Sequence, residues 1–126
     1  MIMGLKVAIV GSRELGSVDF YGVMNRLVEK MVTKPTEVIS GGAKGYDTMA
    51  ARWAKEREIK LNEMRPEYAK YGRAATFIRN RNIVDSADIV VAFWDYKSKG
   101  TKYTIDYARN NEKTLIIVPT YGNEIH

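Results

Sequence analysis

The amino-acid sequence predicts an α/β fold with a five-stranded, mainly parallel sheet and helices on both faces. Short β-branched runs alternate with segments of helical apolar spacing, an arrangement typical of parallel sheets with right-handed crossovers. The length suits one compact domain, residues 1–126, and the composition of 45% hydrophobic and 28% charged residues is ordinary for a globular protein. The expected strand order is 3-2-1-4-5, half of a doubly wound sheet.

The first half of the chain alternates strand, helix, strand and helix. Residues 5–10 form a short β-rich run that stops at Gly11, as a buried strand does. Apolar residues at steps of three and four predict a helix over residues 18–31. The next strand is expected at residues 37–40, and helical spacing returns over residues 46–54.

The second half continues this alternation. Residues 59–64 alternate apolar and polar side chains, which predicts a half-exposed or edge strand. Residues 66–72 are expected to be a loop, and residues 74–84 a third helix with Phe77 on its apolar face. The most continuous apolar run, residues 88–93, predicts a central strand buried on both sides. The last two expected elements are a helix over residues 101–110 and a strand over residues 114–118.

The composition narrows the chemistry. The sequence has no cysteine and a single histidine, His126 at the last position, so we expect no disulfide, no metal site and no cofactor. The net charge of +5 favours an anionic partner, a nucleotide or nucleic acid, or else marks a basic surface without a partner. The five residues before the first lysine are too few for a signal peptide or a membrane span. We therefore expect a cytoplasmic protein with no membrane partner.

Glycine and polar residues follow three of the predicted strands. Residues 11–13 end the first strand, residues 40–45 the second and residues 94–95 the fourth. The carboxyl ends of parallel strands share one edge, and the strand order reverses between the first and fourth strands, where such sheets bind ligands. Glycines and exposed amides at a helix start favour an anion there, although a tight strand-to-helix turn is the alternative. The glycine segment is neither G-x-G-x-x-G nor a Walker loop.

Three further positions each have two interpretations. Asp47 is either a first-turn carboxylate favoured by the helix dipole, or an acceptor that binds a ribose hydroxyl or fixes the loop. Arg81 falls on the apolar stripe of its helix and is expected to face the core, where it either pairs with Asp47 or Asp85 or binds phosphate. Gly100-Thr101 either caps a helix or opens a second phosphate-binding helix start.

Aromatic and basic residues also lie near these loops in the sequence. The aromatic ones, which either stack on a base or pack inside the protein, are Tyr46, Trp94, Tyr96 and Tyr103. The basic ones, which are placed to surround the same opening, are Arg13, Lys44, Arg52, Lys97, Lys99 and Lys102.

These motifs resemble the SLOG superfamily, which unites the DNA-processing protein Smf/DprA with the LOG phosphoribohydrolases, and most closely its stand-alone YspA-type branch. Residues 7–13 are similar to the opening motif, residues 40–47 to the S-G-G-A-x-G-x-D segment, and residues 79–81 to an R-N-R segment shared with DprA. Gly100-Thr101 sits where LOG proteins place G-G-x-G-T. The resemblance implies a Rossmann-like fold that binds nucleotide-derived ligands with phosphate at the glycine loops, and a homodimer like those of LOG proteins.

The sequence departs from LOG enzymes at a functional position. Those enzymes carry a glutamate two or three residues after the G-T, where this chain has Tyr103 and Thr104. The nearest acid in that helix, Asp106, lies a full turn further on. A hydrolase of this type would therefore have to use Asp47 or Asp95.

Three functions are expected, in order of preference. The first is binding of a nucleotide-derived phosphorylated small molecule. The second is a phosphoribohydrolase that cleaves the N-glycosidic bond of a nucleoside monophosphate, with Asp47 or Asp95 as the catalytic carboxylate. The third is weak, DprA-like binding of single-stranded nucleic acid through the basic edge. The expected ligand- and phosphate-binding residues are Gly11, Ser12, Arg13, Ser40, Gly41, Gly42, Ala43, Lys44, Gly45, Asp47, Arg79, Arg81, Trp94, Gly100 and Thr101.

Overall fold

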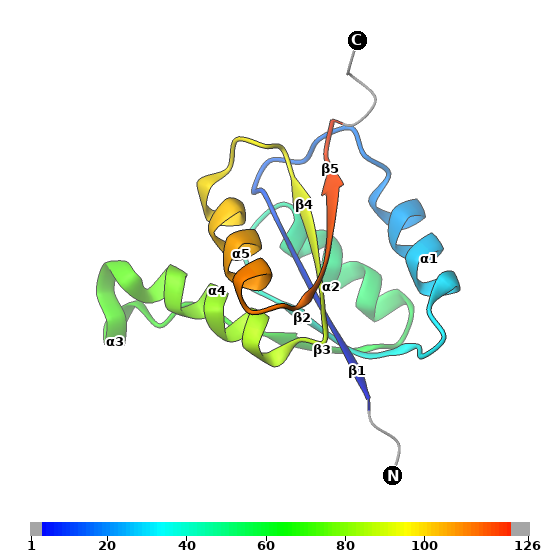
Figure 1. The fold of residues 1–126 in the computed structure, drawn as a ribbon, viewed down its shortest axis with the longest axis horizontal. Coiled ribbons are helices and arrows are strands. Elements are labelled where there is room, and N and C mark those ends of the chain that lie inside the picture. Colours follow the sequence, from blue (N-terminus) through cyan, green and yellow to red (C-terminus); the bar gives the residue numbers. More distant parts are fainter. Residues whose placement is uncertain (1–3, 122–126) are drawn as a thin grey trace.

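The sheet has five strands in the order β3-β2-β1-β4-β5, and all four neighbouring pairs are parallel. The structure is a computed structural model that describes residues 4–121. It confirms the predicted α/β fold class and strand order. The strands are β1 (Leu5–Gly11), β2 (Pro35–Ser40), β3 (Lys60–Glu63), β4 (Ile89–Trp94) and β5 (Thr114–Pro119) (Figure 1).

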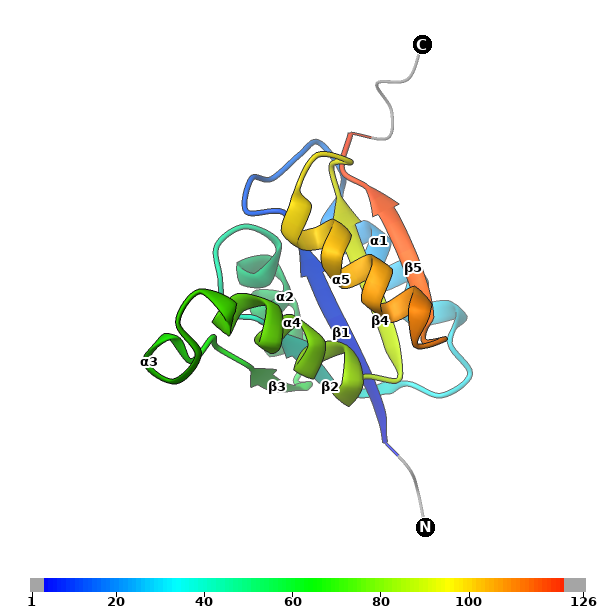
Figure 2. The same cartoon turned by 60° about the vertical axis from the view of Figure 1, so that its left-hand side comes forward.

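Two long helices cover each face of the sheet, as the alternating pattern predicts. α4 and α5 lie in front of the sheet in Figure 2, and α1 lies behind it with α2. A short helix, α3, and a turn of 3-10 helix, η1, connect β3 to α4 at one side of the sheet (Figure 1). The helices are α1 (Phe20–Lys30), α2 (Tyr46–Glu56), α3 (Tyr68–Tyr71), η1 (Gly72–Ala74), α4 (Ala75–Ser86) and α5 (Lys99–Asn110).

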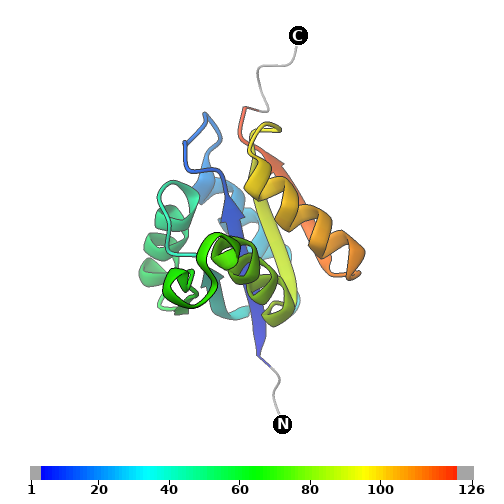
Figure 3. The ribbon, with the colours of Figure 1, turned by 90° about the vertical axis from the view of Figure 1, so that its left-hand side faces the viewer.

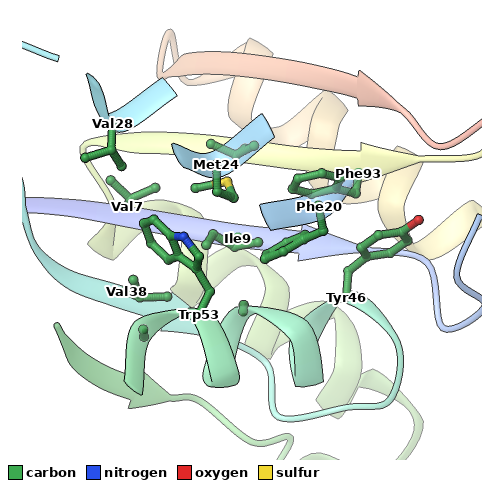
Figure 4. Packing of buried hydrophobic residues seen from close by; sticks show 12 residues of the cluster. Val7, Ile9, Phe20, Met24, Val28, Val38, Tyr46, Trp53 and Phe93 are labelled. Carbon is green, nitrogen blue, oxygen red and sulfur yellow. The ribbon is translucent and has the colours of Figure 1, made fainter. Parts of the chain in front are cut away.

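Aromatic rings fill the core between the sheet and helices α1 and α2. The rings of Tyr46 and Phe93 stack with their centroids 5.0 Å apart, and Phe20 lies 4.8 Å from Phe93 (Figure 4). Trp53 is buried, and its indole N–H donates to the Asn25 Oδ1 at 2.9 Å. Since Tyr46 opens α2 and Phe93 lies near the end of β4, this stack holds the start of α2 against the carboxyl end of the sheet.

Smaller side chains fill the other core, between the sheet and helices α4 and α5. Ala8 and Ala92 come from the strands, and Ile83 and Ile105 from the helices. Residues 90–93 of β4 have no exposed surface, because β4 is paired on both sides and covered on both faces. This confirms the prediction of a central strand.

Two predicted boundaries are wrong. The segment 66–72, expected to be a loop, contains α3 and the start of η1, because a single four-residue turn is too short to show apolar periodicity. The first helix begins at Phe20 rather than at Val18. The Asp19 carboxylate accepts a hydrogen bond from the Gly22 N–H at 3.1 Å, and this N-cap sets the start of the helix.

Helix α4 buries a face that only partly agrees with the prediction, since Val84 is buried as expected but Phe77 is not. Arg79 and Ile83 are buried, whereas Phe77 is 46% exposed and packs edge-on against Tyr103. Arg81, which was expected to face the core, is exposed, so that prediction is wrong. A charged residue, Arg79, occupies a core-facing position of the helix, and the pattern of apolar residues therefore pointed to the wrong side.

Candidate functional site

A cavity of about 590 Å³ lies beyond the carboxyl ends of β1 and β4, where the strand order reverses. We call it the rim cavity. Its walls come from the end of β1 and the loop after it, the loop between β2 and α2, helix α4, and the loop from β4 into the first turn of α5. The loops after β1 and β4 leave the same end of the sheet (Figures 2 and 3).

The structure brings most of the predicted site residues together. Ten of them line the rim cavity, and two others, Gly42 and Lys44, line an adjoining cavity of about 370 Å³. Four of the predicted residues, Ser40, Gly45, Arg81 and Trp94, line neither cavity. The ten that line the rim cavity are Gly11, Ser12, Arg13, Gly41, Ala43, Asp47, Arg79, Asp95, Gly100 and Thr101.

The aromatic residues expected near the loops lie outside the rim cavity. Tyr46 is 1% exposed and belongs to the core, so packing is the one of its two expected roles that the structure shows. Trp94 packs against Tyr96 with ring centroids 4.4 Å apart, and its indole N–H donates to the Ser98 carbonyl at 3.0 Å. Tyr103 packs against Phe77. Packing is therefore the observed role of these rings.

The loop between β2 and α2 is shaped by internal hydrogen bonds. The Ala43 N–H donates to Asp47 Oδ2 at 3.0 Å, and the Gly42 N–H donates to Ser40 Oγ at 3.4 Å. Two of the amides expected to face a phosphate are thus engaged inside the protein. Gly45 has a φ of 77°, and a Cβ there would lie 2.5 Å from the Ser12 carbonyl oxygen. This position therefore requires glycine.

Asp47 is a buried carboxylate on the wall of the rim cavity. It is 8% exposed, and burial raises its pKa above the ordinary value. The Ala43 amide and the nearby positive charge of Arg79 oppose this rise without cancelling it. The side chain fixes the loop between β2 and α2, residues 41–45, which we call the glycine loop. Fixing this loop is one of the two functional roles predicted for Asp47.

Arg79 is a buried cation that forms part of the same wall. It is 9% exposed, its Nη1 donates to the Gly41 carbonyl at 2.6 Å, and its Nε donates to Asn80 Oδ1 at 2.8 Å. Within residues 4–121 no carboxylate lies within ion-pair distance of it. Burial lowers its pKa, and the negative charge of Asp47 opposes this change. An arginine stays protonated in proteins, so the wall carries a desolvated positive charge.

Ser12 and Asp95 also line the rim cavity, and they directly follow the ends of β1 and β4. The Ser12 hydroxyl is buried and has no hydrogen-bond partner of good geometry in the described chain, although it lies close enough to Asp95 to stabilise that carboxylate. Asp95 Oδ1 accepts from the Ser98 N–H at 2.7 Å and the Lys97 N–H at 2.8 Å. Burial raises the pKa of Asp95, but the hydrogen bonds outweigh it and hold the pKa below the ordinary value.

The first turn of α5 is capped by Ser98. Its Oγ accepts from the Thr101 N–H at 3.4 Å and lies 3.2 Å from Thr101 Oγ1. Thr101 and Thr104 both face the rim cavity. Asp106, the acid nearest to the glutamate position of LOG enzymes, does not line the cavity and pairs with Lys102 at 2.8 Å.

The predicted basic residues divide between the two cavities and the remaining surface. Arg13 lines both, Lys97 lines the rim cavity, and Lys44 lines the adjoining cavity. Arg52, Lys99 and Lys102 line neither. The charged residues that line the rim cavity are three cations and three carboxylates: Arg13, Arg79, Lys97, Glu14, Asp47 and Asp95.

Several residues that line the cavities were not predicted from the sequence. Thr76 and Asn80 both line the rim cavity from α4. Asn80 is the middle residue of the R-N-R segment and Thr76 lies one helical turn before it, so this spacing could have indicated that both face the same side. Arg65 and Tyr68 line the adjoining cavity. Their place in the sequence could have indicated this, because they closely follow the carboxyl end of β3, which lies at the same edge of the sheet as the other strand ends.

Residues 4–121 contain no group of three or more histidine, cysteine, aspartate or glutamate side chains arranged to hold a metal ion. His126 lies outside the described residues. None of the helices in the described part of the chain has the length and apolar character needed to cross a membrane.

Comparison with known proteins gives one match. The sequence model of the YspA, cpYpsA-related SLOG family matches residues 5–71, which extend from the start of β1 to the end of α3 and include the glycine loop. No curated protein and no solved structure matches the chain. Membership of this family suggests nucleotide-related binding or processing. With its strand order, its loop at the end of β2 and this match over more than half its length, the chain belongs to the YspA, cpYpsA-related SLOG family.

Proposed function

We propose that the protein binds a nucleotide-derived phosphorylated ligand in the rim cavity. The observation that carries this proposal is the buried guanidinium of Arg79, which faces the cavity without a carboxylate within ion-pair distance in residues 4–121. A buried charge that no ion pair neutralises is costly, and an anionic ligand group would offset that cost. The planar guanidinium also matches the geometry of phosphate oxygens.

The rest of the wall suits the remainder of such a ligand. Asp47 and Asp95 offer carboxylate oxygens that accept hydrogen bonds from ribose hydroxyls. The Ser12 hydroxyl, which has no hydrogen-bond partner of good geometry within residues 4–121, and the Thr101 hydroxyl are additional donors. Arg13, which lies at the opening and is exposed, adds a second positive charge beside Arg79.

The test compares two arginines of the same helix. Isothermal calorimetry with AMP and ADP-ribose should show micromolar or tighter binding by the wild type and at least about tenfold weaker binding by Arg79→Gln. Arg81→Gln, two residues away but exposed and outside both cavities, is the matched control and should bind as the wild type does. Thermal unfolding of each variant checks that it is folded.

Two results would count against the proposal. One is unchanged affinity in a folded Arg79→Gln variant, and the other is the absence of nucleotide binding by the wild type. Retention of single-stranded DNA with an affinity that falls steeply as salt rises would favour nucleic-acid binding instead, because phosphate contacts release counterions.

A second candidate function is cleavage of the N-glycosidic bond, and the two carboxylates of the rim cavity favour it. The pKa of Asp47 is raised and that of Asp95 is lowered, and a pair of acids tuned in opposite directions is typical of acid–base catalysis. In this reaction the bond from the anomeric carbon to the base breaks, the base leaves with a proton, and a water oxygen bonds to that carbon while the water loses a proton. Asp47, with its raised pKa, would donate the proton to the base and then take one from the water, and the Asp95 carboxylate would stabilise the positive charge on the sugar.

Chromatography of a panel of nucleoside monophosphates tests this candidate. Release of free base that is lost in both Asp47→Asn and Asp95→Asn would support it, while binding without release from any member of the panel would leave the protein as a binding domain.

A further inference from the structure

The adjoining cavity, which we call the basic cavity, differs in charge from the rim cavity. It is lined by four cations, Arg13, Lys44, Arg65 and Arg79, with no carboxylate among its lining residues in the described chain. Positive charges gathered without a counter-charge repel one another, and a cavity of this kind concentrates anions. The basic cavity therefore has the electrostatics of an anion site, whereas the rim cavity balances its charges.

Arg65 is an exposed arginine that lines the basic cavity. Its Nη1 donates to the Gly42 carbonyl at 3.2 Å, which holds the guanidinium over the glycine loop. Its Nη2 lies 3.7 Å from a Glu63 oxygen. This ion pair is exposed to solvent, so it is weak and neutralises little of the Arg65 charge. Neither Arg13 nor Lys44 forms an ion pair within residues 4–121, so both charges are available to a ligand.

The two cavities share one wall. Arg13, Gly41, Ala43 and Arg79 line both of them. A side chain at position 41 would collide with the Arg79 guanidinium, so the backbone at this glycine lies directly against the charge. A ligand that occupied both cavities would contact Arg79 at the shared wall and would meet Arg65 and Lys44 only in the basic cavity.

We propose that the basic cavity binds a second phosphate, so that the ligand carries at least two linked phosphates, as nucleoside diphosphates and their esters do. One phosphate at the shared wall uses Arg13 and Arg79, and a monoester there carries a charge of only about −1.5 to −2. Arg65 and Lys44 remain for a second phosphate bonded to the first. The exposed ring of Tyr68 lies at the edge of this cavity, where a group esterified to the second phosphate would pass.

The inference rests on the proposed function for the nucleoside part of the ligand, but its preference for linked phosphates can be tested without a nucleoside. Calorimetry with inorganic pyrophosphate and inorganic phosphate should show that the wild type binds pyrophosphate at least about tenfold more tightly. Arg65→Gln should weaken pyrophosphate binding about tenfold while changing phosphate binding less than about twofold. ADP and AMP should show the same pattern.

Arg52→Gln is the matched control, because Arg52 is exposed and lines neither cavity. Lys44→Gln is a second variant that should act in the same direction as Arg65→Gln. Equal affinity for the two inorganic anions, no binding of either, or an equal loss for both in Arg65→Gln would overturn the subsite. Selective pyrophosphate binding with no binding of ADP or AMP would instead uphold the subsite and reject the proposed nucleotide ligand.

Discussion

Asp47 and Asp95 line the same cavity, but folding changes their protonation in opposite directions. The pKa of Asp47 rises chiefly because the carboxylate is buried. Asp95 also experiences burial, yet two backbone amides donate to its Oδ1 and bring its pKa below the ordinary value. Each shift is also a statement about how the free energy of unfolding depends on pH.

These shifts predict opposite pH effects of two matched substitutions. Asp95 stabilises the fold above its unfolded-state pKa of about 3.9, and this contribution is lost as the pH falls through its lower folded-state pKa. The stability advantage of the wild type over Asp95→Asn should therefore shrink between pH 6 and pH 3. Ionised Asp47 carries a burial cost that protonation removes, so the wild type should gain relative to Asp47→Asn over the same interval.

Urea unfolding of the three proteins at both pH values measures these differences. If the two comparisons changed with pH in the same direction, the opposite environments assigned to the carboxylates would be wrong.

At the scale of elements, the start of α2 depends on backbone geometry rather than on a capping side chain. Gly45 is the N-cap residue and makes no side-chain hydrogen bond to the helix. The Tyr46 N–H donates instead to the Ser12 carbonyl at 3.4 Å, which joins the helix to the loop after β1. The glycine loop and the end of β1 are consequently built as one unit.

Gly45→Ala should destabilise the protein by about 2 kcal/mol or more. The substitution combines a positive φ, which costs an L-residue on the order of 1–3 kcal/mol, with a collision against the backbone oxygens of Ser12 and Arg13. Gly100→Ala is the control, since a Cβ at Gly100 meets nothing within 4 Å and alanine favours a helix by up to about 1 kcal/mol. Urea unfolding would refute the first expectation if the two variants were equally stable.

At the scale of the whole molecule, the loop after β1 is tied to elements that are distant in sequence. The Ser17 and Val18 amides donate to the Thr120 carbonyl at 2.9 and 3.1 Å, just after β5. The Gly16 N–H donates to the Tyr46 hydroxyl at 2.9 Å, at the start of α2. The loop that carries Ser12 and Arg13 is thus held both by the residue that follows the edge strand β5 and by the first residue of α2.

Removal of the Tyr46 hydroxyl should make this loop more mobile without creating a cavity in the core, because the aromatic ring stays in place. Tyr46→Phe leaves the Gly16 N–H without its partner and should cost about 1–2 kcal/mol of unfolding free energy. Hydrogen exchange should accelerate at Gly16 and Ser17. Tyr21→Phe, on the same core with no hydrogen bond of its hydroxyl in the described chain, should leave these amides unchanged. Unaltered exchange in Tyr46→Phe would show that the hydroxyl does not hold the loop.

Most of the fold could be predicted from the sequence, because the signals are local. Alternating β-branched and helical segments fix the class, and parallel pairing places all the strand ends at one edge. The same reasoning predicts a site at the ends of β1, β2 and β4, and the rim cavity lies there. Gly11, Asp47 and Asp95 were found in this way, since each directly follows or ends a strand or opens a helix.

The orientation of individual side chains could not be predicted in the same way. Arg79 and Arg81 stand in one R-N-R segment, and exposed Phe77 shifted the expected apolar face of α4 toward the wrong arginine. For Tyr46 the sequence left stacking on a base and packing both open, because its partner, Phe93, lies far away in the sequence and only the fold brings the rings together. Both positions depend on contacts between distant elements, which periodicity within one element does not report.

The wall shared by the two cavities has a consequence for how ligands would compete. Since Arg79 borders both spaces, two separate anions would repel each other while sharing the field of one guanidinium, and by linkage each would weaken the other equally. Two phosphates joined in one molecule avoid a second loss of translational freedom, and the first holds the second at a high effective concentration. The protein would then distinguish linked phosphates from separate ones. Inorganic phosphate would occupy one of the two cavities at a time, and only a molecule with two linked phosphates would fill both.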